Sequence, residues 1–134
     1  MTNDEQSSLN VPASLIRDVR RALYAFLDDA AKQVSATVQR PEHELHPEWF
    51  AAADDHLVRG FALLDELGHD DGPCDTEIMP EHGRTLLEVL DQVALLLTDW
   101  MAVHDDHDPE WSDHRDRYQL LLRVEAEVRR DATW

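Results

Sequence analysis

The chain has 134 residues, the size of a single domain, and 43% of them are apolar, which is ordinary for a globular protein. It carries 29 acidic and 12 basic residues, a net charge of −17, so its surface repels nucleic-acid backbones and anionic lipids. Cys74 is its one cysteine, which excludes an internal disulfide. Without a signal-peptide pattern or an apolar run that could span a membrane, we expect a cytoplasmic protein.

Residues 1–10 are polar and acidic, and we expect a disordered tail there, ahead of one domain over residues 11–134. Apolar residues recur at three- and four-residue steps from Ile16 to Val38, which predicts a helix over residues 12–40. Asn10 or Ser14 is expected to cap the start of this helix.

A second apolar stripe, from Phe50 to Leu64, predicts a helix over residues 47–67 with Gly68 as its stop signal. Gly60 lies inside this helix, where glycine costs about 1 kcal/mol relative to alanine. We therefore expect Gly60 to allow the close approach of a neighbouring helix.

The third predicted helix, residues 80–103, is the most apolar segment, with an apolar arc of roughly 200°, wider than one core-facing stripe needs. The outer flank of this arc, Val89, Leu96 and Val103, is a candidate homodimer interface. A fourth helix is predicted over residues 109–130. Because most connections are short, neighbouring helices should be antiparallel. The sequence thus predicts an all-α fold, an up-down-up-down antiparallel four-helix bundle.

The stretch FALLDELGHDDGP, which starts at Phe61, and EHGRTLLEVL, which starts at Glu81, carry apolar spacing and a glycine stop. Both stretches lie in roughly the middle third of the chain. This part resembles small helical proteins of high-GC actinobacteria. The resemblance implies a helical fold and no particular function.

Two segments share a pattern of two histidines three residues apart followed by Pro-Glu-Trp: HELHPEW from His43 and HDDHDPEW from His104. An up-down bundle would place both at one pole. There His43, His46, His104 and His107 form a candidate zinc or nickel ligand set. The alternative is simpler, because Pro-Glu opens three of the predicted helices and suits a helix start. The histidines are then solvated residues at the helix tips.

Two charged residues, Arg20 and Glu125, fall within the apolar arcs of the first and fourth helices. A buried carboxylate needs a partner, so we expect Arg20, or Tyr24 one turn away, to meet Glu125, unless both long side chains reach water. We interpret Glu88 and Asp91 as a pair on a helix surface. His56 is interpreted as a packing residue.

The recognised motifs of helical-bundle enzymes are missing from the sequence, apart from Arg40 and His46 at a spacing found in some helical nucleases. The sequence therefore favours a non-enzymatic, strongly acidic interaction protein that binds a basic protein partner, of the antitoxin, anti-factor or nucleic-acid-mimic type. A metal-binding bundle with a histidine pole and a small helical nuclease are the alternatives.

Overall fold

The computed structural model describes residues 8–39, 47–68 and 75–131. Most of these residues lie in four helices, α1 (Ala13–Gln39), α2 (Pro47–Leu67), α3 (Gly83–Val103) and α4 (Pro109–Asp131), and a 3-10 turn, η3 (Pro80–His82), leads into α3. The predicted helices and the mostly helical class are therefore confirmed. None of the helices in these ranges is both long and apolar enough to cross a membrane.

A short antiparallel ribbon, formed by β1 (Leu9–Val11) and β2 (Thr76–Ile78), was not predicted from the sequence. Leu9 pairs with Ile78 and Val11 pairs with Thr76. The side chains of Leu9, Val11 and Ile78 are buried in the core. We expected a disordered tail over residues 1–10, but Leu9 and Asn10 lie in β1, and a three-residue strand is too short to show a clear alternating pattern in the sequence. Residues 1–7 lie outside the described residues, so the tail stays a prediction there.

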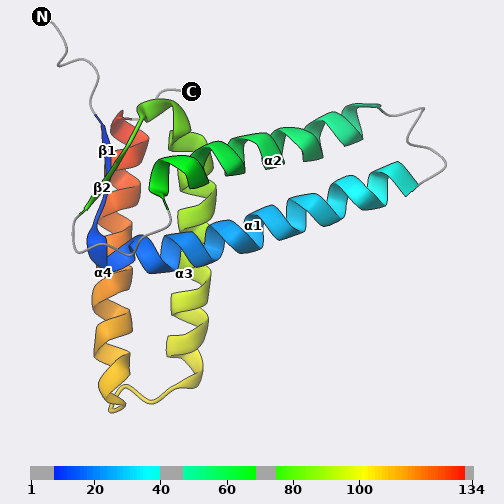
Figure 1. Ribbon diagram of the computed structural model, residues 1–134. Helices are drawn as coiled ribbons and strands as arrows, with labels where there is room; N and C mark the ends of the chain where they lie inside the picture. Colours follow the sequence, from blue (N-terminus) through cyan, green and yellow to red (C-terminus); the bar gives the residue numbers. More distant parts are fainter. Residues whose placement is uncertain (1–7, 40–46, 69–74, 132–134) are drawn as a thin grey trace, which may run out of the picture.

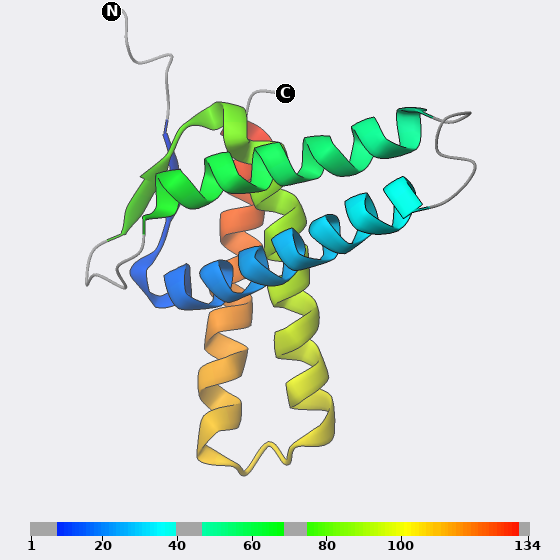
Figure 2. The same cartoon turned by 45° about the vertical axis from the view of Figure 1, so that its right-hand side comes forward.

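The four helices form two antiparallel hairpins, α1 with α2 and α3 with α4. In both views the α1–α2 hairpin lies across the α3–α4 hairpin, and its far end extends away from it (Figure 1 and Figure 2). The four roughly aligned axes of the expected up-down bundle are not seen. Apolar periodicity tells which face of a helix is buried, but several crossing angles satisfy the same apolar face.

The hydrophobic core lies where the two hairpins and the ribbon meet. It contains Leu15, Val19 and Leu23 of α1, Leu63 of α2, Leu86, Val89, Leu90 and Val93 of α3, and Leu121, Val124 and Val128 of α4. Toward the connection between α3 and α4 the burial decreases, and Trp111 ties the two helices together by donating its Nε1 hydrogen to the Met101 carbonyl oxygen at 3.1 Å.

The first turn of α1 is capped by a residue from a distant part of the chain. The Oδ1 atom of Asp75 accepts the backbone N–H of Ala13 at 2.9 Å, and its Oδ2 atom accepts the side-chain amide of Asn10 at 3.3 Å. The predicted local cap is therefore replaced by Asp75, which precedes β2. The β1–β2 pairing places Asp75 beside the start of α1, which no local pattern could indicate.

Gly60 lies at the close approach of α2 to α1, as the sequence predicts. A Cβ atom at this position would lie 2.5 Å from Leu27 Cδ2 and 3.3 Å from Phe26 Cδ1. Gly68 ends α2 with a φ of 73°, in the left-handed region that favours glycine, and its N–H donates to the Leu64 carbonyl oxygen.

Candidate functional site

Half of the predicted histidine set falls outside the described residues, namely His43 and His46, and so does Arg40 of the nuclease-like spacing. The end of α1 and the start of α2 lie far from the connection between α3 and α4 in both views (Figure 2). The bundle topology that would bring the four histidines to one pole is therefore not the observed arrangement. The four-histidine metal site stays a prediction without that support.

The other two histidines have separate surroundings. The His104 ring stacks on Trp100 with a centroid separation of 3.8 Å, and its Nδ1 atom lies 2.7 Å from the Trp100 carbonyl oxygen. His107 Nδ1 lies 2.8 Å from Asp105 Oδ1 and 3.0 Å from Asp106 Oδ1. Hydrogen bonds from the His107 backbone N–H and then from its ring hold the pKa of Asp105 below its usual range.

Within the described ranges, Asp105, Asp106 and His107 are the only group with three potential ligand atoms within 4.8 Å of one another. All three side chains are exposed, and their mutual hydrogen bonds account for their proximity. We assign no ion to this group.

The predicted buried polar pair is buried as expected, with Arg20 8% and Glu125 5% exposed. Their observed contacts are different, however. Arg20 Nε donates to the Gly68 carbonyl oxygen at 3.3 Å, and Glu125 accepts from Arg129 Nη2 at 3.2 Å and contacts Asp91. Tyr24, the alternative partner, is half exposed. Arg20 thus contacts the end of α2, while Glu125 joins α4 to α3.

The predicted interface on α3 needs one correction. Val89 is buried in the core, because it lies near the crossing with α1, so it cannot contribute to an exposed contact surface. Leu96 and Val103 are 60% and 78% exposed, so both side chains remain available for a contact.

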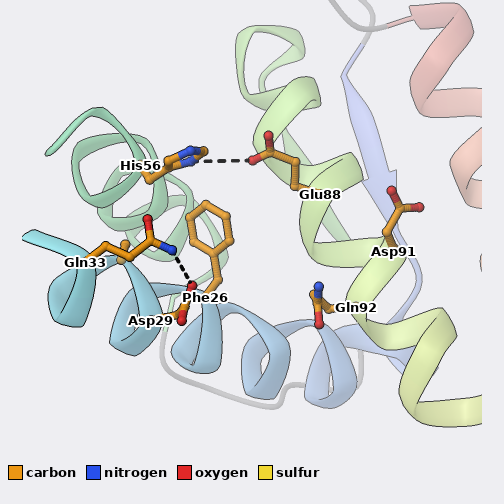
Figure 3. A pocket seen from close by; sticks show the side chains of 8 residues that line it. Phe26, Asp29, Gln33, His56, Glu88, Asp91 and Gln92 are labelled. Carbon is orange, nitrogen blue, oxygen red and sulfur yellow. Dashed lines mark hydrogen bonds and ion pairs between the residues drawn. The ribbon is translucent and has the colours of Figure 1, made fainter. Parts of the chain in front are cut away.

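A cleft of about 350 Å³ lies between α1, α2 and α3 (Figure 3). Its lining residues are Phe26, Asp29, Ala30, Gln33, His56, Glu88, Asp91 and Gln92. Three of them are carboxylates, and no lysine or arginine is among them. We name this the acidic cleft.

Glu88 and His56 are directed toward each other across the acidic cleft, from α3 and α2 (Figure 3). His56 Nδ1 lies 4.0 Å from Glu88 Oε2, which is beyond hydrogen-bond distance. The same nitrogen lies 3.4 Å from Arg59 Nη2. Because a guanidinium only donates hydrogen bonds, this contact requires an unprotonated Nδ1, which has no hydrogen to offer Glu88.

The Glu88 carboxylate is therefore incompletely satisfied. Its Oε2 atom is shielded from solvent and has no hydrogen-bond partner within the described part of the chain. A buried acceptor without a partner costs roughly 1–3 kcal/mol, and more when it is charged. Such an oxygen is a strong acceptor for a donor that enters the cleft from outside.

Asp91, one turn from Glu88, points away from His56 (Figure 3) and contacts Glu125 of α4. Burial raises the pKa of Glu125, and the hydrogen bond to Asp91 and its negative charge raise it further, while Arg129 acts in the opposite direction. This carboxyl–carboxylate pair adds negative potential behind the acidic cleft.

The cleft side chains are too widely spaced for a preformed metal site, because they contribute no group of three ligand atoms within 4.8 Å. The described neighbours of His56 are Arg59, Glu88 and Phe26, and none of them carries a hydroxyl or thiol group. The arrangement therefore suits a cation with several donors, such as a guanidinium. From the sequence, Glu88 and Asp91 are interpreted as a pair on a helix surface and His56 as a packing residue. The sequence does not indicate the cleft, because the neighbours of these residues on the other helices are distant in the chain.

Comparison with family models, with curated proteins and with solved structures gives no match to this chain. The resemblance to small actinobacterial helical proteins therefore stays a prediction.

Proposed function

We propose that this protein is a non-enzymatic interaction protein that binds a basic protein partner, and that the acidic cleft receives an arginine side chain of that partner. The net charge of −17 supports long-range attraction of a basic surface. The observation that carries the proposal is the solvent-shielded Glu88 Oε2 atom without a hydrogen-bond partner.

An arginine fits this position for three reasons. Its guanidinium supplies several donors in one plane, which suits a carboxylate that lacks a partner. The Phe26 ring lines the same cleft and can contact the planar cation by its face or edge. Asp29 and Asp91 at the rim favour positive charge over neutral donors.

Capture of the protein with its partners from its own cells tests this proposal. We expect a basic protein to be retained at low salt and released as the ionic strength rises, because the attraction between exposed charges is screened within about 8 Å at physiological salt. The Glu88→Gln variant should retain much less of it. Glu81→Gln is the matched control, since Glu81 is exposed on η3, outside the acidic cleft, and the net charge changes equally.

Equal capture of the partner by the Glu88→Gln and Glu81→Gln variants would show that the acidic cleft does not bind it. Capture that is insensitive to salt would remove the electrostatic basis of the proposal. An antitoxin, an anti-factor and a nucleic-acid mimic are the partner classes that a strongly acidic helical protein suits, and the identity of the captured protein would distinguish them.

A second candidate is self-association through the exposed part of α3. Leu96 and Val103 are large apolar side chains left exposed on one helix, which favours a contact there. Light scattering across a concentration series tests it: a dimeric mass that becomes monomeric in Leu96→Glu supports this candidate, and a monomeric mass throughout excludes it.

A further inference from the structure

A second cleft, of about 480 Å³, lies between α1, α3 and α4. It differs from the acidic cleft in charge, because three arginines line it: Arg17 and Arg21 of α1 and Arg117 of α4. The chain has 12 basic and 29 acidic residues, so a cleft lined by three arginines differs from the acidic character of the chain as a whole. We name this the arginine cleft.

The three arginines are not equally neutralised. Arg117 pairs with Asp18 and, at 3.2 Å, with Asp113. Arg17 and Arg21 lie one turn apart on the exposed side of α1 and make no ion pair with the residues that the structure describes. Like charges four residues apart on a helix repel each other, so an anion that bridges Arg17 and Arg21 would relieve this repulsion.

Besides the three arginines, the cleft is lined by Asp18, which pairs with Arg117, by Glu110 and His114, and by the apolar side chains of Val93, Leu96, Leu97 and Trp100. Val93 and Leu97 are buried beneath it, and Leu96 is more than half exposed beside it. A volume of this size suits a small molecule with an apolar body and a few polar groups. The cleft therefore combines a place for one negative group with a place for an apolar chain or ring.

The stacking around Trp100 limits which ligands the arginine cleft can bind. Its ring is enclosed between the His104 and His114 rings, each at a centroid separation of 3.8 Å and nearly parallel, with interplanar angles of 8° and 9°. Both faces of the indole are thus covered, and a nucleobase or another flat ring cannot stack on it. Ligand contacts are left to the edge of Trp100 and to the aliphatic side chains, which favours an alkyl chain over a flat ring.

We infer that the arginine cleft binds a small amphipathic anion, with its carboxylate or phosphate head on Arg17 and Arg21 and its alkyl chain along Leu96. A neutral molecule with the same chain cannot form charge-assisted hydrogen bonds with Arg17 and Arg21, so it binds far more weakly. This site is separate from the acidic cleft and does not depend on the protein-partner proposal.

Calorimetric titration of the full chain with octanoate, octyl phosphate and octanol tests the inference. We expect saturable binding of at least one anion, and octanol weaker by about tenfold or more, because charge-assisted hydrogen bonds are lost. The preferred anion distinguishes a carboxylate head from a phosphate head. Absence of saturable binding by both anions, or equal binding of octanol, would overturn the inference.

A pair of double variants locates the site. Arg17→Gln/Arg21→Gln should weaken the binding of the preferred anion by about tenfold or more. Arg84→Gln/Arg123→Gln should leave it unchanged, because Arg84 and Arg123 are exposed and lie outside both clefts, while the net charge changes equally. Circular dichroism confirms that each variant is folded. An equal effect of the two double variants would show that charge alone matters and would overturn the assignment.

Discussion

Gly60 offers the sharpest test of how α1 and α2 pack. In the substitution Gly60→Ala two effects oppose each other. Alanine in a helix interior is favoured over glycine by about 1 kcal/mol. Against this, the added Cβ would lie 2.5 Å from Leu27 Cδ2 and 3.3 Å from both Leu27 Cγ and Phe26 Cδ1, whereas carbon atoms in contact prefer about 3.5–4.0 Å.

The packing effect should be the larger one. Leu27 is a buried member of the core, so its side chain has little room to move away, and overpacking of this kind costs about 1–3 kcal/mol. After the gain in helix propensity is subtracted, we expect Gly60→Ala to lower the free energy of unfolding by about 1 kcal/mol. For a domain of this size the melting temperature should fall by about 4 °C.

A double-mutant cycle with Leu27→Ala separates the two effects. Leu27→Ala alone should cost about 2–4 kcal/mol, because it leaves a cavity. In that background the nearest atoms to the new Cβ are gone, so Gly60→Ala should stabilise the protein by up to about 1 kcal/mol. Urea unfolding monitored by circular dichroism measures all four proteins. If Gly60→Ala stabilises the otherwise unchanged chain, or costs the same in both backgrounds, the close approach of Leu27 is not what selects glycine.

Three further substitutions test other contacts. Asp75→Ala should destabilise the protein by about 1 kcal/mol in urea unfolding, because the first turn of α1 loses its cap; the exposed Asp99→Ala is the control, and equal effects would contradict the capping role. Gly68→Ala should lower the free energy of unfolding by about 1 kcal/mol, because a φ of 73° strains an alanine, although the added Cβ would meet no atom within 4 Å. Gly68→Asn should cost less, and the reverse order would contradict a left-handed cap. The pKa of Glu125 is raised in the folded state. Its protonated form therefore contributes stability that is fully present below the ordinary pKa of a glutamate and is lost as the pH rises through the raised pKa. Glu125→Gln should therefore be more stable than the unchanged chain at pH 7, with the difference shrinking on acidification, and thermal melts from neutral to acid pH that run parallel for the two proteins would refute this.

The sequence by itself determined the local elements of this protein. Apolar periodicity placed all four helices, and Gly68 marked the end of α2 because few other residues tolerate its backbone conformation. Gly60 was recognised as a contact position because glycine inside a helix is costly unless a neighbour needs the space. The burial of Arg20 and Glu125 also followed from periodicity, since each falls on the apolar side of its own helix.

Only the tertiary structure decided how these elements meet. The angle between the two hairpins is set by packing between side chains far apart in the chain, and the same apolar stripes are compatible with an antiparallel bundle whose four helix axes are aligned. That angle buries Val89, sets the end of α1 and the start of α2 away from the α3–α4 connection, and brings Arg20 to the Gly68 carbonyl oxygen. The ribbon that brings Asp75 to the start of α1 depends on a pairing across more than sixty residues. Both clefts arise at the crossing of α1 with α3, so Glu88 and His56, like Arg17 and Arg117, become neighbours only there, because spatial proximity between helices leaves no periodic trace in the sequence.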